Sequence, residues 1–446
     1  MAQKLQAEMW DKLHYLFRSY NDRVIHVELH YDFELDADII KKFVSNLYEK
    51  APILHSSFVH SVIRPYWVVN PYNVDDAITI RHIKESEKEA VIEEFLMQEI
   101  NPSDKLQFRV GLFYYEGKTA FCFVSNHMCF DGGDTKYLTV KMCQDYNRFV
   151  ETGEMPNDIR TGSRSHKMIY RDLSEDDRKA AGKLIRNPSV KDPHKFPLTE
   201  SRPDDKSFMA KHNLDREAFK NIKVLGKKNG FTLNDILMTA YYEAVYRLAN
   251  FDKKDSLTIA GAIDLRRYIK DMKGVGLTNH TAWMQVNIPH LGKDIFETLK
   301  LVAESTNKFK QDKFMGMYGL PLLNFGYTLP HAIGEIAVKI GYANPHLAMS
   351  NIGFIDPVGT TICGHEPIYG FMSGAVKYKP FVLLSAITYK EDCILAMGVR
   401  GNDKDKEIVN KFYSIYDECL NELIEGWKEY LNNFVKKCCN LVKTAL

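Results

Sequence analysis

The stretch FVSNHMCFDGGD, from Phe123 to Asp134, places a histidine and an aspartate four residues apart at the end of an apolar run. The segment from Gln107 to Asn126 predicts a β-hairpin, because its apolar residues alternate in the first half and Glu116-Gly117 suits a turn. Its second half, Ala120 to Val124, is apolar on both faces, which is typical of a strand at the centre of a sheet. We therefore expect a buried strand that ends just before His127.

A helix is expected after the two glycines. The segment DTKYLTVKMCQDYNRFVETG has Asp134 as a suitable N-cap, apolar residues along one side and Gly153 at its end. His127 and Asp131 are thus predicted to lie in a strand-to-helix loop. Open α/β sheets bind ligands at such places, and the start of a helix offers free backbone N–H groups.

His127 has the chemistry of a proton carrier at this position. With an ordinary pKa of about 6.5, an imidazole can take a proton from an attacking hydroxyl or amine and return it to a leaving group. Gly132 and Gly133 would let a substrate pass close, and their amides could face a developing oxyanion. Two alternatives stay open: a structural histidine held by hydrogen bonds, and a metal pair with Asp131, which would need at least one more ligand.

Other catalytic motifs are missing from the sequence. There is no GxxxxGK[ST] loop, and Gly274-Val275-Gly276 lacks the third glycine of a dinucleotide-binding turn. The segment from Gly370 to Gly374 reads GFMSG and not GxSxG. Nothing near His127 supplies HxH or HExxH spacing, so no metal site is predicted. These observations exclude nucleotide-binding and serine-hydrolase readings.

Composition limits the class of protein. The chain has 446 residues, 45% hydrophobic and 26% charged, which is enough for two domains with their own cores. Lys and Arg total 59 against 58 Asp and Glu, so the net charge of +1 argues against nucleic acid as a partner. No apolar run approaches the roughly 18 residues of a membrane span. The eight cysteines include no CxxC pair, and we expect a cytoplasmic protein that is neither secreted nor membrane-spanning.

The flanking sequence predicts an α/β fold. Val24 to Phe33 alternates as a strand does, and Asp36 to Pro52 has a cap, helical spacing and a closing proline. Further along, Leu214 to Ala249 predicts two helices around a Gly-Phe-Thr break, and Ser256 to Tyr268 follows as a strand. Helices and strands therefore alternate on both sides of the His127 loop.

The charged, proline-containing segment from Glu154 to Ser207 suggests partial helices and a crossover. We accordingly predict a first lobe over residues 1–190, a crossover linker over residues 191–207 and a second lobe over residues 208–446.

A family resemblance adds to these observations. The run NHMCFDGG resembles the HxxxDG signature of the CoA-dependent acyltransferase superfamily, which includes chloramphenicol acetyltransferase, condensation domains, polyketide-associated acyltransferases and alcohol acetyltransferases. The family's P-x-L-x-x-x-F segment is matched by Pro52, Leu54 and Phe58. Later segments also resemble the family in order along the chain, namely GFTLNDILMTAYYEAV, AIDLRRY, LTNHTAW and SNIGFID. Together they span roughly residues 24 to 425, which is most of the chain.

The resemblance implies a two-lobed chloramphenicol acetyltransferase-like fold, with a mixed sheet flanked by helices in each lobe and an active-site channel between the lobes. His127 would be the general base, and the acyl group would move directly from an acyl thioester to an alcohol or amine. Asp131 would pair with Arg266 of the second lobe in a structural role, beside Gly132 and Gly133. The co-substrate would be acyl-CoA, with no tightly bound cofactor.

Three polar residues in apolar surroundings are further candidates. Asn279 lies in LTNHTAW, and Ser350-Asn351 opens SNIGFID. As turn and cap residues they would hold strands together. As site residues, Ser350 or Asn351 would help to polarise the thioester carbonyl, and Asn279 is a candidate for the same substrate-facing role.

The chain departs from the family pattern at Asn126. Condensation domains usually carry a second histidine immediately before the catalytic one, and several ester-forming relatives do not. The free-standing alcohol acetyltransferase and polyketide-associated branches are therefore the most similar, and the plant-type DFGWG segment is missing. Condensation on the thioester of an acyl or peptidyl carrier protein is the alternative function. A non-catalytic binding member of the family is a third hypothesis.

The C-terminal tail predicts a long amphipathic helix with a basic end. Its first half resembles the last packing helix of the family, and residues after about Trp427 exceed what the fold needs. The end, VKKCCNLVKTAL, contains Cys438 and Cys439. We expect a solvent-facing helix end, with contact to a membrane surface as the alternative, because so few lysines are a weak anchor without a second signal.

Overall fold

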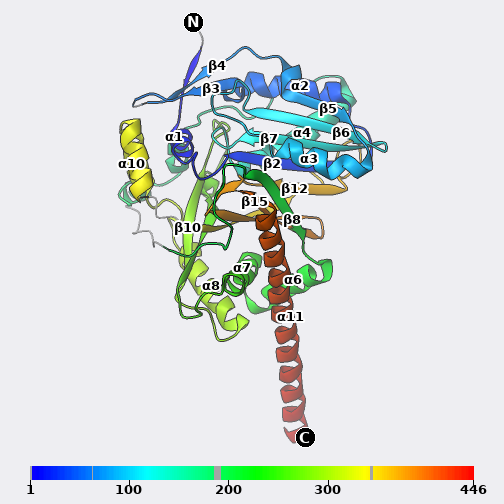
Figure 1. Ribbon diagram of the computed structural model, residues 1–446, viewed down its shortest axis with the longest axis vertical. Helices are drawn as coiled ribbons and strands as arrows, with labels where there is room; N and C mark the ends of the chain where they lie inside the picture. Colours follow the sequence, from blue (N-terminus) through cyan, green and yellow to red (C-terminus); the bar gives the residue numbers. More distant parts are fainter. Residues whose placement is uncertain (1–2, 63, 185–191, 342–344, 446) are drawn as a thin grey trace.

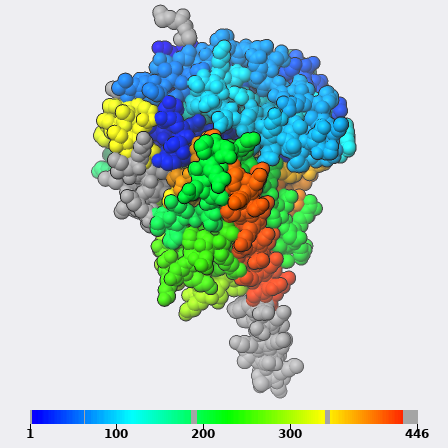
Figure 2. All heavy atoms as spheres, viewed as in Figure 1, coloured from blue at the N-terminus to red at the C-terminus, as the bar shows by residue number. Residues whose placement is uncertain are grey.

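A computed structural model describes residues 3–62, 64–184, 192–341 and 345–445. Two lobes are stacked on each other, and the helix α11 (Asp403–Ala445) runs along the second lobe (Figure 1). In the space-filling view, the blue and cyan first lobe lies against the green and orange second lobe (Figure 2). Among the described residues, no helix combines the length and apolar composition needed to cross a bilayer.

The first lobe is built on a five-stranded sheet in the order β12-β2-β7-β6-β5, with a small sheet β1-β4-β3 beside it. Helices α2 and α4 pack on one face of the larger sheet and α3 packs on the other. Its elements are β1 (Lys4–Gln6), α1 (Met9–Leu16), β2 (Val24–Tyr31), α2 (Ala37–Lys50), β3 (Ser56–Val59), β4 (Tyr66–Val69), β5 (Ile78–His82), α3 (Lys88–Leu96), β6 (Phe108–Tyr115), β7 (Lys118–Asn126) and α4 (Gly132–Thr152).

The second lobe is built on a seven-stranded mixed sheet in the order β10-β9-β11-β14-β15-β13, to which β8 adds by pairing with β15. Helices α6, α7, α8 and α11 contribute to the core on one face of this sheet. The remaining elements of the chain are α5 (Glu175–Ala181), β8 (Lys206–Asn213), α6 (Arg216–Asn229), α7 (Leu233–Ala249), β9 (Leu257–Asp264), β10 (Thr281–Ile288), α8 (Ile295–Lys310), α9 (Leu320–Thr328), α10 (His331–Gly341), β11 (Leu347–Ile355), β12 (Tyr369–Ser373), β13 (Lys377–Tyr378), β14 (Val382–Tyr389) and β15 (Asp392–Gly401).

The hairpin predicted from residues 107–126 is confirmed as β6 and β7, which pair in antiparallel register. Its turn places Glu116 and Gly117 at φ values of 47° and 73°, in the left-handed region that tight hairpin turns require. β7 lies between β2 and β6, and from Thr119 to Asn126 all of its residues are buried. A central strand of this kind fixes where the chain emerges at His127.

The two lobes share a strand and part of a core. β12 comes from the region expected to form the second lobe, but it pairs with β2 in the sheet of the first. Ile387, Ile394 and Ala396 of the second sheet pack into the first lobe's core. The predicted boundaries near residues 190 and 208 stay a prediction, and they do not account for this strand. Packing between the lobes therefore depends on β12.

The long helix predicted for the C-terminal tail is confirmed, because α11 extends to Ala445. Buried side chains from Val409 to Trp427 join the second lobe's core, as expected for a last packing helix. The side chains of residues 429–446, including Cys438 and Cys439, lie outside the described part of the structure. The choice between a solvent-facing end and a membrane contact stays open.

Phe371 on β12 tests this shared packing. Its side chain is fully buried in the first lobe's core, so Phe371→Ala is expected to lower the free energy of unfolding by about 3–5 kcal/mol. Urea denaturation of the two proteins measures the difference. The control is Ile368→Ala, three residues earlier and 52% exposed, which should change stability by no more than about 0.5 kcal/mol. Similar small losses in both variants would mean that β12 does not hold the lobes together.

Candidate active site at the lobe interface

His127 lies in the loop between β7 and α4, as the sequence predicted. The cap of α4 is not Asp134, however, but Asp131, three residues earlier. The Oδ1 atom of Asp131 accepts hydrogen bonds from the N–H groups of Gly133 at 3.0 Å and Asp134 at 3.3 Å. The helix starts earlier than expected because Asp131 satisfies two of its free N–H groups. The residue that caps α4, Asp131, is therefore also the last residue of the His127 loop.

Three hydrogen bonds to other segments hold His127. Its backbone N–H donates to the carbonyl oxygen of Arg23 at 2.7 Å. Its Nδ1 atom lies 2.9 Å from Oδ1 of Asn279, which belongs to the second lobe. The Nδ2 group of Asn279 in turn donates to the carbonyl oxygen of His127 at 2.7 Å. Asn279 therefore grips both the ring and the backbone of His127 from across the interface.

This contact fixes the tautomer of His127. Because the amide N–H of Asn279 donates to a carbonyl, its oxygen must be the atom that faces the ring. The oxygen can only accept, so the neutral imidazole carries its proton on Nδ1 and leaves the lone pair on Nε2. An imidazole in this state is ready to receive a proton at Nε2.

The surroundings keep His127 neutral. The residue is only partly exposed, and burial lowers the pKa of His127 below its ordinary value. The ring of His14 on α1 stacks against it, with 4.6 Å between ring centroids. Burial, followed by the nearby His127, lowers the pKa of His14 well below its ordinary value. Both rings are uncharged near neutral pH, as a general base must be.

Asp131 and Arg266 form the predicted ion pair between the lobes. The Nη1 atom of Arg266 lies 2.8 Å from Oδ1 and 2.9 Å from Oδ2 of Asp131. Oδ2 also accepts from the backbone N–H of His280 at 2.7 Å and the hydroxyl of Thr281 at 3.0 Å. Burial alone would raise the pKa of Asp131, but the charge and hydrogen bonds of Arg266 outweigh it and hold that pKa below its usual range. Asp131 stays ionised.

A second carboxylate, that of Asp134, binds the same loop of the second lobe, which contains Thr278 and Asn279. Asp134 accepts from the backbone N–H of Thr278 at 2.7 Å, and it pairs with Arg266 at 3.0 Å and also with Arg160. Burial raises the pKa of Asp134 to about 6, although Arg266 opposes the effect. Asn279 lies between the two residues, Thr278 and His280, that these aspartates hold. The loop that presents Asn279 to His127 is therefore bound to the start of α4.

The two glycines differ in how closely other groups surround them, and Gly133 has the expected structural role beside Asp131. A Cβ atom on Gly133 would come within 2.7 Å of Nη1 of Arg266, so the ion pair requires glycine there. Its N–H already donates to Asp131 and is not free for a developing oxyanion, which makes that part of the expectation wrong. A Cβ atom on Gly132 would meet nothing within 4 Å. Gly133 thus serves the structure around Asp131 and not the substrate.

Ser350 and Asn351 lie on β11, in the central part of the second sheet. Oδ1 of Asn351 accepts from the N–H of Gly353 at 3.0 Å, at a point where the strand has a bulge. This contact agrees with a turn role for Asn351. The hydrogen bonds recorded for His127 come from Arg23 and Asn279, and the substrate role of Ser350 and Asn351 stays a prediction.

Asn126, where condensation domains usually have histidine, is fully buried. Its Nδ2 group donates to Gln107 at 2.7 Å, and its Oδ1 atom accepts from the N–H of Met128 at 3.0 Å. Asn126 therefore stabilises the His127 loop from its buried side, by joining Met128 to Gln107. Among the described residues, no group of three or more His, Cys, Asp or Glu side chains could hold a metal ion.

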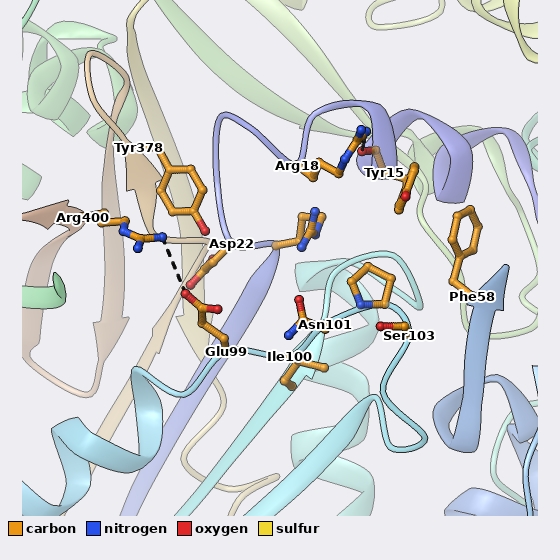
Figure 3. Close-up of a pocket in the computed structure, with 12 residues that line it drawn as sticks. Tyr15, Arg18, Asp22, Phe58, Glu99, Ile100, Asn101, Ser103, Tyr378 and Arg400 are labelled. Carbon is orange, nitrogen blue, oxygen red and sulfur yellow. Dashed lines mark hydrogen bonds and ion pairs between the residues drawn. The ribbon is translucent and has the colours of Figure 1, made fainter. Parts of the chain in front are cut away.

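A cavity of about 350 Å³ lies between the lobes, and Figure 3 shows side chains converging on it from both. Phe58 and Asn101 of the first lobe face Tyr378 and Arg400 of the second. His127 does not line the cavity, but its backbone N–H donates to the carbonyl oxygen of Arg23, which does. Sequence patterns gave no sign of Arg23 or His14, since neither lies in a motif. The cavity lies between the lobes as expected, but it is not lined by His127, and the channel with His127 at its middle stays a prediction.

Loss of one member of the ion pair should destabilise the protein. Asp131 is 1% exposed and the side chain of Arg266 is 13% exposed, so Asp131→Asn leaves a largely buried guanidinium without its closest charge, at an expected cost of about 3–5 kcal/mol. Since the folded pKa of Asp131 is lowered, its contribution is complete above the unfolded value of about 3.9 and is lost as the pH falls from that value through the lower folded pKa. The stability gap between wild type and variant should therefore narrow in acid.

Urea denaturation at several pH values measures this effect. Glu94→Gln is the matched control, because Glu94 pairs with Arg81 at 3.1 Å on the surface and should contribute less than about 1 kcal/mol. An Asp131→Asn protein as stable as the control would contradict the role given to this pair.

The chain is similar to known proteins in sequence and in fold. The family model named condensation domain matches residues 3–254. No individual curated protein matches the chain. The structure of polyketide synthase associated protein 5 from Mycobacterium tuberculosis is similar at 14% identity and a TM-score of 0.64, covering 94% of this chain and 98% of that one.

Two further solved structures have the same fold. Trichothecene 15-O-acetyltransferase from Fusarium sporotrichioides is similar at 11% identity and a TM-score of 0.65, with coverage of 94% of this chain and 95% of that one. The first condensation domain of the calcium-dependent antibiotic synthetase gives 14% identity, a TM-score of 0.66, and coverage of 95% and 96%. At these identities the likeness shows the fold, which confirms the expected two-lobed chloramphenicol acetyltransferase-like architecture. Since the family model spans more than half of the 446 residues, the chain belongs to the condensation-domain family.

Proposed function

We propose that the protein is an acyltransferase that moves an acyl group from an acyl thioester to an alcohol or amine, with His127 as general base. The contact between Nδ1 of His127 and Oδ1 of Asn279 carries this proposal. It leaves the Nε2 lone pair of a neutral, partly exposed imidazole available at the interface of the two lobes.

The reaction needs one proton carrier. The acceptor O–H or N–H attacks the thioester carbonyl as Nε2 of His127 takes its proton, and a bond from carbon to oxygen or nitrogen forms. The tetrahedral intermediate then collapses, the C–S bond breaks, and the imidazolium returns the proton to the leaving thiolate. No covalent enzyme intermediate and no bound cofactor are required. Ser350 or Asn351 would help to polarise the carbonyl.

The donor is proposed to be acyl-CoA. The likeness in fold to a trichothecene 15-O-acetyltransferase is in keeping with an enzyme that acylates a small molecule. The match to the condensation-domain model favours a second candidate, in which the thioester is carried by an acyl or peptidyl carrier protein. Comparing acyl-CoA with acyl-loaded carrier protein as the donor separates the two.

Replacement of His127 tests the proposal directly. With acyl-CoA and a panel of alcohols and amines, wild type should release free thiol, and His127→Ala should lower kcat by about 10²–10⁴-fold while melting normally. The control is His365→Ala, which removes an exposed histidine paired with Asp32 at 2.8 Å. Equal turnover in wild type and His127→Ala would remove the base from the mechanism. Ligand-induced stabilisation without any turnover would favour the non-catalytic hypothesis.

Asn279 should set the pH range of activity. In Asn279→Asp a carboxylate replaces the amide oxygen beside Nδ1 and favours the imidazolium, so the pKa of His127 rises. Because the base must be neutral, activity is lost as the pH falls through this pKa. The acid limb of kcat/KM, expected below about 6.5 in wild type, should move up by about one unit in the variant. An unchanged profile would contradict the contact between Asn279 and the base.

A further inference from the structure

The cavity between the lobes contains an arginine whose charge is not matched. Arg23 lies at the start of β2, is 7% exposed, and lines the cavity. Its Nε and Nη1 atoms are buried and have no hydrogen-bond partner among the described residues. Two buried guanidinium nitrogens without hydrogen-bond partners are costly, which makes this position unfavourable unless an anion completes it.

The backbone of Arg23 is held in place by specific contacts. Its φ of 60° lies in the left-handed region, which is unusual for a residue with a side chain. Its N–H donates to Oδ1 of Asn21 at 3.0 Å, and its carbonyl oxygen accepts from His127 at 2.7 Å. An uncommon conformation fixed from both sides often marks a functional position. Here it fixes where the Arg23 side chain leaves the backbone, beside the proposed base.

The carboxyl group of Asp22 attracts the charge of Arg23, but it makes no hydrogen bond to the Nε or Nη1 atom of that arginine. Asp22 uses Oδ1 to accept from the N–H groups of Val24 and Val376, both at 3.0 Å, and burial raises the pKa of Asp22 to about 7. Glu99 is 3.7 Å from Arg400 across the cavity, as the dashed line in Figure 3 marks. The cavity wall therefore presents more positive than negative charge.

Further basic residues surround the same place. Arg18 lines the cavity and pairs with Glu335 on α10. Lys377 is partly buried, and burial lowers the pKa of Lys377 to about 8. The like charges on Arg18 and Arg23 repel each other, so a bound anion would relieve that repulsion as well.

We propose that this cavity binds a carboxylate of the acyl acceptor through Arg23, so that the acceptor is a small hydroxy acid or amino acid. This inference rests on the proposed acyl transfer. A guanidinium suits a carboxylate because its planar fork can make two parallel hydrogen bonds. Phe58 and Ile100 give the cavity an apolar wall for the rest of the acceptor. Reaction of such an acceptor forms the ester or amide bond and frees the thiol, with the carboxylate unchanged.

The position of Arg23 argues for the acceptor over the donor. The carbonyl oxygen of Arg23 accepts a hydrogen bond from the backbone N–H of His127, so a single hydrogen bond joins the backbone of this cavity residue to that of the proposed base. The phosphate of a pantetheine donor is separated from the thioester by the whole pantetheine arm. A carboxylate a few bonds from the attacking hydroxyl or amine fits this short separation better.

Melting temperatures test the site without relying on turnover. Wild type is heated with lactate, phenyllactate, glycine and tyrosine, each compared with its carboxamide, and also with inorganic phosphate and CoA. At least one acid should raise the melting temperature when its amide does not. In Arg23→Gln the affinity for that acid should fall by about 10- to 100-fold, and in Arg23→Lys, which keeps the charge but loses the fork, by less. The lysine variant also serves if the glutamine variant fails to fold.

The control is Arg81→Gln, which removes an exposed arginine paired with Glu94. This control should bind the acid as wild type does. Equal stabilisation of all variants, or none by any acid, would overturn the carboxylate site. Stabilisation by phosphate and CoA alone, lost in Arg23→Gln, would overturn it in favour of a donor phosphate.

Failure of this inference is distinguishable from failure of the proposed function. His127→Ala should keep the binding of the acid that depends on Arg23, because its side chain makes no recorded contact with the arginine side chain. If transfer to uncharged alcohols occurs and no acid binds, only the carboxylate site falls. If the acid binds through Arg23 but no thioester is ever consumed, the acyl transfer falls and the anion site remains.

Discussion

The buried ion pair between Asp131 and Arg266 is the interaction on which the arrangement of the site depends. Asp131 caps the first helix after the histidine loop, while Arg266 comes from the second lobe, so the pair joins the two halves of the molecule. The same carboxylate accepts from the N–H of His280. This places the residue before it, Asn279, against His127. One charged contact thus aligns a loop of each lobe, and the orientation of the imidazole follows from that alignment.

The site divides its tasks between residues that touch the reacting centre and residues that only place them. Asn279 sets the tautomer of the base, and Asn126 supports the loop from the buried side. Asp131 and Asp134 do not need to touch substrate. Asp131 accepts hydrogen bonds from N–H groups at the start of α4, and Asp134 accepts one from the loop that contains Asn279. Such an arrangement lets substrate preference vary in the cavity without disturbing the base. Arg23 belongs to the cavity wall and to the base's support, and it couples the two.

Local pattern was enough to predict β6, β7 and the helix that follows, because alternation, turn residues and helical spacing are all encoded within a few residues. The pair of Asp131 with Arg266 came from family resemblance, since nothing local links residues 135 positions apart. Asn279 was a candidate, but its grip on His127 could not be read from spacing across 152 positions. Sequence patterns did not predict the pairing of β12 with β2 or the unpaired Nε and Nη1 atoms of Arg23. Both features arise only when distant segments pack together.

The proposed mechanism requires His127 to be a neutral imidazole at neutral pH, with its proton on Nδ1 and its lone pair on Nε2. Nitrogen-15 NMR of the histidine side chains, with His127 assigned from the spectrum of a His127→Gln protein, observes this state directly. We expect a protonated Nδ1 and an unprotonated Nε2 at pH 7. A proton on Nε2, or a doubly protonated ring at that pH, would contradict it.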